Sequence, residues 1–185
     1  MVSRRGLFVG SGGLLATALL GKPASATVAR SLSLQALVRG SRRVAIITAL
    51  SAESHFEELG RRRRIVTDTR VRIEEHIAKE ELRESEVLVR TLGGSVGRLG
   101  ELVHGQAQLQ IGEPCVAFLL QGPDGLHYFN GMAQGHYPLS GDAGKRLLRS
   151  PDLPELLNFE GSAVKALVGS ELTPARERIR TVSQP

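Results

Sequence analysis

Two neighbouring stretches of this chain alternate between apolar and polar side chains with a period of two residues. In residues 44–56, one face comprises Val44, Ile46, Thr48, Leu50, Ala52, Ser54 and Phe56. In residues 65–78 the alternation is clearer, and one face comprises Ile65, Thr67, Thr69, Val71, Ile73 and Ile77. A period of two is that of a β-strand with one buried side. A charged turn with Gly60 joins the stretches, so we expect a long antiparallel pair.

The length of this pair limits the folds that it can enter. At about 3.3 Å per residue, a strand over 65–78 would extend roughly 45 Å, which is too long for a flat strand in a small domain. The pair must therefore coil, bulge or close into a barrel.

The remaining pattern adds one short helix and several shorter strands. Apolar spacing predicts a helix within 31–42. Further strands are expected at 86–92, 115–120, 127–132 and, as an edge strand stopped by Pro138, 134–139. The sequence thus predicts a mainly β fold, a five- to six-stranded antiparallel Greek-key barrel over 31–139. A β-sandwich is the alternative geometry.

The chain changes character after about residue 140. Pro151, Pro154 and Pro174 break it into short pieces, with helical turns possible at 154–158 and 162–168. Residues 140–185 are therefore predicted to form an irregular, partly helical and partly disordered C-terminal extension, with a frayed last dozen residues.

The first 26 residues have the pattern of an export signal. Arg4 and Arg5 precede a short apolar run, and small residues lead up to a predicted cleavage site after Ala26. The run of about 13 residues is shorter than the ~20 that a membrane-spanning helix needs, so no stable membrane span is expected. The sequence Ser-Arg-Arg-Gly-Leu-Phe resembles the twin-arginine (Tat) signal, which implies export of the folded protein by the Tat translocase. An ordinary Sec signal is the alternative, and both predict a periplasmic or extracellular protein.

Composition narrows the choice of partners. The chain has 24 Lys and Arg against 19 Asp and Glu, and loss of the signal would remove three of the basic residues. A nearly balanced protein has no strong electrostatic attraction to nucleic acid. Aromatic residues are 4 % of the chain and Trp is absent, so a sugar-stacking platform is poorly supplied. Cys115 is the only cysteine, so no internal disulfide can form.

Residues 34–138 also resemble a family of known barrels. The stretches that carry the resemblance are LVRGSRRVAIITAL (37–50), RIVTDTRVRIEEHI (64–77), VLVRTLGGSVG (87–97), GEPCVAFLLQGPDG (112–125) and GMAQGHYPL (131–139). They are similar to the oligonucleotide/oligosaccharide-binding (OB) barrel of netrin-like modules and tissue inhibitors of metalloproteinases. Those inhibitors use an N-terminal cysteine and several disulfides. This chain would begin at Thr27 and has one cysteine, so the resemblance implies the barrel and not the inhibition.

Several residues are candidates for chemistry. His104, His127 and His136 fall at one predicted end of the sheet, but none has metal-site spacing, so we expect no metal. Cys115 begins a strand that is apolar on both faces, where cysteine behaves as a small buried hydrophobe. The glycine-rich segment 93–97 lacks the Gly-Lys-Ser/Thr of a phosphate loop and fits a barrel corner. The arginines of 61–64 fit a solvated turn better than a lipid-binding patch.

The predicted partner surface is the sheet edge around 93–105 and 127–138, where a His-Tyr pair is expected to be exposed. Its predicted binding residues are His104, His127, Gln134, His136 and Tyr137. With no nucleophile–base signature and no cofactor fingerprint, the sequence predicts a non-enzymatic exported module that needs no cofactor and binds a protein or an envelope polymer. A metal- or cofactor-dependent periplasmic enzyme or redox accessory is the alternative, and a protease inhibitor is a weaker one.

Overall fold

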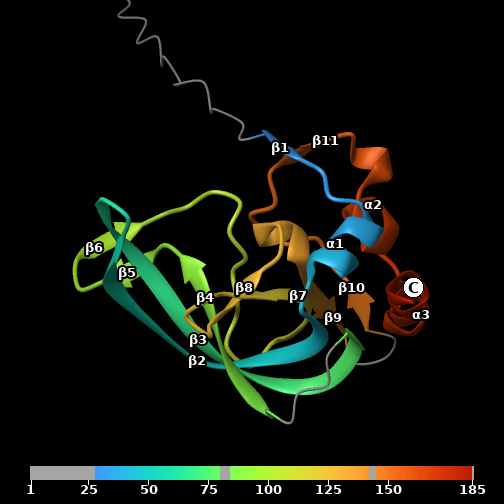
Figure 1. Ribbon diagram of the computed structural model, residues 1–185, viewed down its shortest axis with the longest axis horizontal. Helices are drawn as coiled ribbons and strands as arrows, with labels where there is room; N and C mark the ends of the chain where they lie inside the picture. Colours follow the sequence, from blue (N-terminus) through green and yellow to red (C-terminus); the bar gives the residue numbers. More distant parts are fainter. Residues whose placement is uncertain (1–27, 80–83, 142–144, 185) are drawn as a thin grey trace, which may run out of the picture.

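The computed structural model describes residues 28–79, 84–141 and 145–184 (Figure 1). The predicted signal peptide, with Arg4, Arg5 and the cleavage site at Ala26, lies outside these residues. Within them, no helix is both long enough and apolar enough to cross a membrane.

A seven-stranded sheet dominates the fold and confirms the mainly β prediction. In spatial order its strands are β10 (Arg146–Leu147), β9 (His136–Ser140), β7 (Pro114–Gln121), β2 (Arg43–Leu59), β3 (Arg62–Lys79), β4 (Glu86–Leu92) and β8 (His127–Phe129). Strand β7 also pairs with β8. All these pairings are antiparallel except that of β4 with β8, which joins Val89 to His127 in parallel.

The long β2–β3 hairpin is bulged, as its length requires. Its register shifts at three points, one of them between Ala49 and Ser51. Before that shift, Ala45 and Ile47 face one core of the protein, whereas after it Ala52 lies on that same side. The prediction that 44–56 presents one uniform face is therefore wrong, because a β-bulge adds a residue and inverts the alternation.

The sheet has a core on each side. The helix-side core includes Val44, Ile46, Val116, Phe118 and Tyr137 of the sheet, together with residues from α1 (Leu34–Gly40), α2 (Ala163–Leu167) and α3 (Leu172–Ser183). The strand-side core consists mainly of Ala45, Ile47, Val71, Val89, Ala117, Leu119 and Phe129. Figure 1 shows the three helices gathered on one side, with the hairpin of β5 (Gly94–Val96) and β6 (Leu99–Glu101) at the opposite end of the molecule.

The predicted N-terminal helix is confirmed as α1. The Ser33 hydroxyl caps it by accepting a hydrogen bond from the Ala36 N–H at 3.1 Å, and Leu37 and Val38 are fully buried. A short 3₁₀ helix, η1 (Met132–Gly135), leads into β9.

The C-terminal region packs onto the sheet over residues 145–184 and is partly helical, as predicted, and most of the predicted frayed end lies in α3. This region contains β11 (Glu155–Leu157), η2 (Phe159–Gly161), α2 and α3, and β11 pairs in parallel with β1 (Val28–Arg30). Leu147, Leu167 and Ile179 are fully buried in the helix-side core. Pro174 does not break α3, because it lies in the first helical turn, where its missing N–H has no helical partner to lose.

Candidate functional site

A cavity of about 490 Å³ lies between the sheet and the segment 93–109. A second hollow, of about 630 Å³, is lined mainly by charged and polar residues of β2 and β3, among them Glu53, His55 and Asp68. We call the first the threonine cavity, because Thr67 and Thr69 of β3 and Thr91 of β4 line it from the sheet. Strand pairing explains their position. Thr67 lies directly opposite Thr91, and Thr69 is two residues from Thr67, so all three point to the same side.

The opposite wall is fixed to the sheet by hydrogen bonds. The Thr67 hydroxyl donates to the Gly93 carbonyl at 2.7 Å and therefore accepts from the Ser54 hydroxyl, 2.8 Å away. Gly94 approaches these groups so closely that a Cβ there would lie 2.3 Å from the Thr67 Oγ1. Only glycine fits at this point, which gives the predicted glycine-rich corner a physical role.

Glu101 connects β6 to the first residues of β3. Its carboxylate accepts a hydrogen bond from the Ile65 N–H at 2.8 Å and forms an ion pair with Arg64. These two contacts, the backbone one foremost, lower the pKa of Glu101. The carboxylate is thus engaged in holding the wall.

The remaining lining of the threonine cavity is neutral and amphipathic. Thr69, Thr91 and Gln108 contribute hydroxyl and amide groups that lie outside the hydrogen bonds of the wall, and Ala107 and Leu109 contribute apolar surface. Cavities of roughly 300–1,000 Å³ with a few polar groups are typical of ligand sites. This lining suits an uncharged ligand that both donates and accepts hydrogen bonds.

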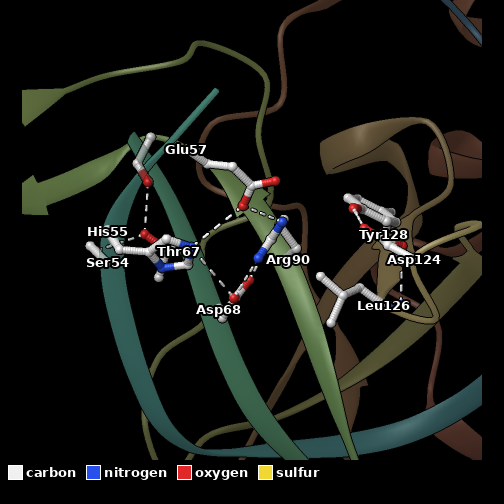
Figure 2. Close-up of polar contacts among 10 residues, drawn as sticks. Ser54, His55, Glu57, Thr67, Asp68, Arg90, Asp124, Leu126 and Tyr128 are labelled. Atoms are coloured by element: carbon white, nitrogen blue, oxygen red, sulfur yellow. Dashed lines mark hydrogen bonds and ion pairs between the residues drawn. The ribbon is translucent and has the colours of Figure 1, made fainter. Parts of the chain in front are cut away.

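A charged network lies on the outer face of the same strands (Figure 2). Arg90 binds both carboxylate oxygens of Asp68, at 2.6 and 2.7 Å, and its Nη1 lies 2.5 Å from an oxygen of Glu57. The His55 ring nitrogen Nε2 lies 3.4 Å from that Glu57 oxygen. The bonds to Asp68 are the main reason why the pKa of Arg90 is raised.

The outer network links β2, β3 and β4 and leaves Arg90 few hydrogen-bond donors for a ligand. Its guanidinium is directed at two carboxylates, and its side chain is only 10 % exposed. Beside it, the Tyr128 hydroxyl donates to Asp124 at 2.5 Å. Burial first and this bond second raise the pKa of Tyr128 to about 12. We infer that the network mainly fixes the strand arrangement behind the threonine cavity.

Four of the five predicted binding residues are buried. His127, Gln134, His136 and Tyr137 are at most 6 % exposed, so the expectation of an exposed His-Tyr pair is wrong. The C-terminal region provides the cover: Tyr137 lies in the helix-side core with Leu147 and Leu153.

Two of these buried polar residues, Gln134 and His136, make hydrogen bonds within the fold. Gln134 holds the N-terminal segment, accepting from the Leu32 N–H at 2.8 Å and donating to the Arg30 carbonyl at 3.1 Å. His136 bonds the Ser150 hydroxyl at 2.9 Å, and burial lowers its pKa to about 4. Only His104, which is 65 % exposed, presents a side chain that a partner could touch. A role of the five residues in binding stays a prediction.

Cys115 lies in the surroundings that the sequence predicts: it is 2 % exposed in the strand-side core, and burial raises the pKa of its thiol. The arginines of 61–64 do not all lie in a solvated turn, because β3 begins at Arg62. Within β3, the Arg63 guanidinium lies over the Phe56 ring at 4.3 Å. Among residues 28–79, 84–141 and 145–184, no three His, Cys, Asp or Glu side chains are grouped to hold a metal ion.

Comparisons with protein-family models, with curated proteins and with solved structures found no match. The function has to be inferred from the residues of this chain and their geometry.

Proposed function

We propose that this protein is an exported, non-enzymatic binding module built on an OB-like barrel, and that it holds a segment of a partner protein in the threonine cavity. The observation that carries the proposal is the cavity itself, about 490 Å³ in volume. Its lining consists of hydroxyl, amide and apolar groups and the carboxylate of Glu101, which is engaged by Arg64 and the Ile65 N–H.

The strand pairings support the barrel. Following them from β2 to β3, β4, β8 and β7 leads back to β2. The circuit encloses the strand-side core, and its one parallel contact is that between β4 and β8.

The lining favours a protein segment over a sugar polymer. Among the described residues, no aromatic ring lines the threonine cavity for stacking against a sugar. Leu102, at its rim, is 69 % exposed, and Leu99 of the neighbouring β6 is 62 % exposed. Exposed leucines beside uncharged hydrogen-bonding groups fit a polypeptide, whose backbone amides and apolar side chains need both kinds of contact.

A peptide library displayed on phage provides the test. Peptides selected on the exported protein should bind Thr69→Val and Thr91→Val more weakly, by about 2- to 10-fold for each lost hydrogen bond. Ser51→Ala, on the exposed outer face, is the matched control and should bind as the wild type does. Equal binding by all three variants would remove the cavity from the site, and binding of cell-wall glycan fragments alone would identify an envelope polymer as the partner.

Export has a separate test. The doubly substituted Arg4→Lys, Arg5→Lys chain should remain inside the cell as the uncleaved precursor if the signal belongs to the Tat class. Continued export of this variant would indicate an ordinary Sec signal, and retention of the wild type inside the cell would contradict export.

A further inference from the structure

A buried arginine lies at the other end of the strand-side core from the threonine cavity. Arg43 is the first residue of β2, nine positions before Ala52, and its side chain is 0 % exposed. It pairs with Leu119 of β7, and two residues later Ala45 pairs with Ala117 without a shift in register. Since Leu119, Ala45 and Ala117 belong to the strand-side core, strand alternation directs Arg43 into that core as well.

The guanidinium of Arg43 is poorly compensated. Among the described residues, neither its Nε nor its Nη1 has a hydrogen-bond partner. Its Nη2 lies 3.5 Å from a carboxylate oxygen of Glu84, at the long limit of a hydrogen bond, and the Glu84 side chain is 60 % exposed. Arginine keeps its charge in proteins, and a buried charge without a close partner is strongly unfavourable.

A second polar side chain enters the same end of the strand-side core: His127 of β8 pairs with Gln121, two residues beyond the Leu119 that pairs with Arg43. His127 is 2 % exposed, and among the described residues neither ring nitrogen makes a hydrogen bond of good geometry, although the Leu88 carbonyl lies close enough to favour the protonated ring. Burial, and then the positive charge of Arg43, lower the pKa of His127. The neutral ring can donate one N–H to a negatively charged group.

We propose that Arg43 and His127 bind a small monatomic anion such as chloride in the strand-side core. The anion would supply negative charge close to the guanidinium, which among the described residues comes only from the exposed Glu84 carboxylate at 3.5 Å. The unpaired Nε and Nη1 do not share an edge of the guanidinium, so they cannot hold one carboxylate or phosphate side-on through two parallel bonds. A spherical ion needs no such edge. This site is independent of the threonine cavity and of the function proposed for it.

Bromide scatters anomalously and replaces chloride, so a crystal of the wild-type protein grown in bromide locates the site directly. The expected result is an anomalous peak within hydrogen-bonding distance of Arg43 Nε or Nη1. Bromide found only at exposed arginines, with water or nothing at Arg43, would overturn the proposal.

Solution measurements provide the second test. When chloride replaces gluconate at constant ionic strength, the melting temperature of the wild type should rise and saturate, because an ion that binds only the folded state stabilises it. Arg70→Met, which removes an exposed arginine of β3, should respond like the wild type. Arg43→Met should lose the saturable rise and, in gluconate, should melt no lower than the wild type, because it removes an uncompensated charge. An equal chloride response in all three proteins would contradict the site.

Discussion

Replacing Gly94 by alanine tests how closely the wall of the threonine cavity is fitted to the sheet. A Cβ at Gly94 would lie 2.3 Å from the Thr67 Oγ1 and 2.5 Å from the Ser54 Oγ, and the residue has a φ of +130°. Alanine would therefore have to displace the hairpin or break the hydrogen bonds that join Ser54, Thr67 and the Gly93 carbonyl.

The expected loss of stability follows from these two effects. A non-glycine residue in so sparsely populated a backbone region costs about 1–3 kcal/mol. Loss of two hydrogen bonds adds about 0.5–1.5 kcal/mol each. Gly94→Ala should thus lower the free energy of unfolding by about 2–6 kcal/mol. It should also weaken peptide binding, because the wall of the cavity moves.

Gly97 is the matched control, since it lies in the same hairpin, has a φ of +61° and would carry a Cβ with no other atom within 4 Å. Gly97→Ala should cost only about 1–2 kcal/mol, the usual penalty of the left-handed region. Urea denaturation with an unchanged m-value measures both losses. In a background of Ser54→Ala and Thr67→Ala, Gly94→Ala should cost only its backbone part. Equal losses of stability from Gly94→Ala and Gly97→Ala would refute the close fit between the cavity wall and the sheet. A Gly94→Ala loss that is no smaller in the Ser54→Ala, Thr67→Ala background would refute it as well.

Three further predictions concern the framework around the cavity. Arg90→Met should lower the free energy of unfolding by about 1–3 kcal/mol. In a double-mutant cycle with Asp68→Asn, the interaction energy between the two side chains should account for most of that loss, and an interaction energy of zero would contradict the network. Ile179→Ala should cost about 2–5 kcal/mol in urea, whereas Thr181→Ala, on the exposed side of α3, should cost under about 1 kcal/mol; similar small losses would mean that α3 does not contribute to the core. The pKa of His136 is held at about 4 by burial, below the ordinary histidine value of 6.5, so the unfolded chain takes up a proton between these pH values and the folded chain does not. Stability should therefore fall by about 1–2 kcal/mol from pH 7 to pH 5, and His136→Gln should flatten that slope; an unchanged slope would contradict a buried neutral ring.

Much of the strand and helix arrangement was predictable from local pattern. The alternation from Ile65 to Ile73 identified the face that carries Thr67 and Thr69 into the cavity. The spacing of Leu34, Leu37 and Val38 identified α1, and the apolar run after Cys115 identified a strand buried on both sides. These features depend on neighbours within one element, which a sequence displays directly.

The rest depends on contacts between distant segments. The bulge near Ala49 has no signature in the alternation, because it appears only when the register with β3 is known. His136 and Tyr137 look exposed until the C-terminal region covers them. The ion pair of Asp68 with Arg90 likewise requires the pairing of β3 with β4, which joins residues 22 positions apart.

Photo-crosslinking in living cells tests the central claim most directly, that the threonine cavity holds a partner protein outside the cytoplasm. A photoreactive amino acid is placed at Leu102, at the cavity rim, and in a control chain at Leu157, which is 61 % exposed on β11. We expect a discrete protein adduct from Leu102 in the exported fraction, and none from Leu157. An adduct from Leu157 alone, or no adduct from Leu102 in correctly exported protein, would contradict the claim.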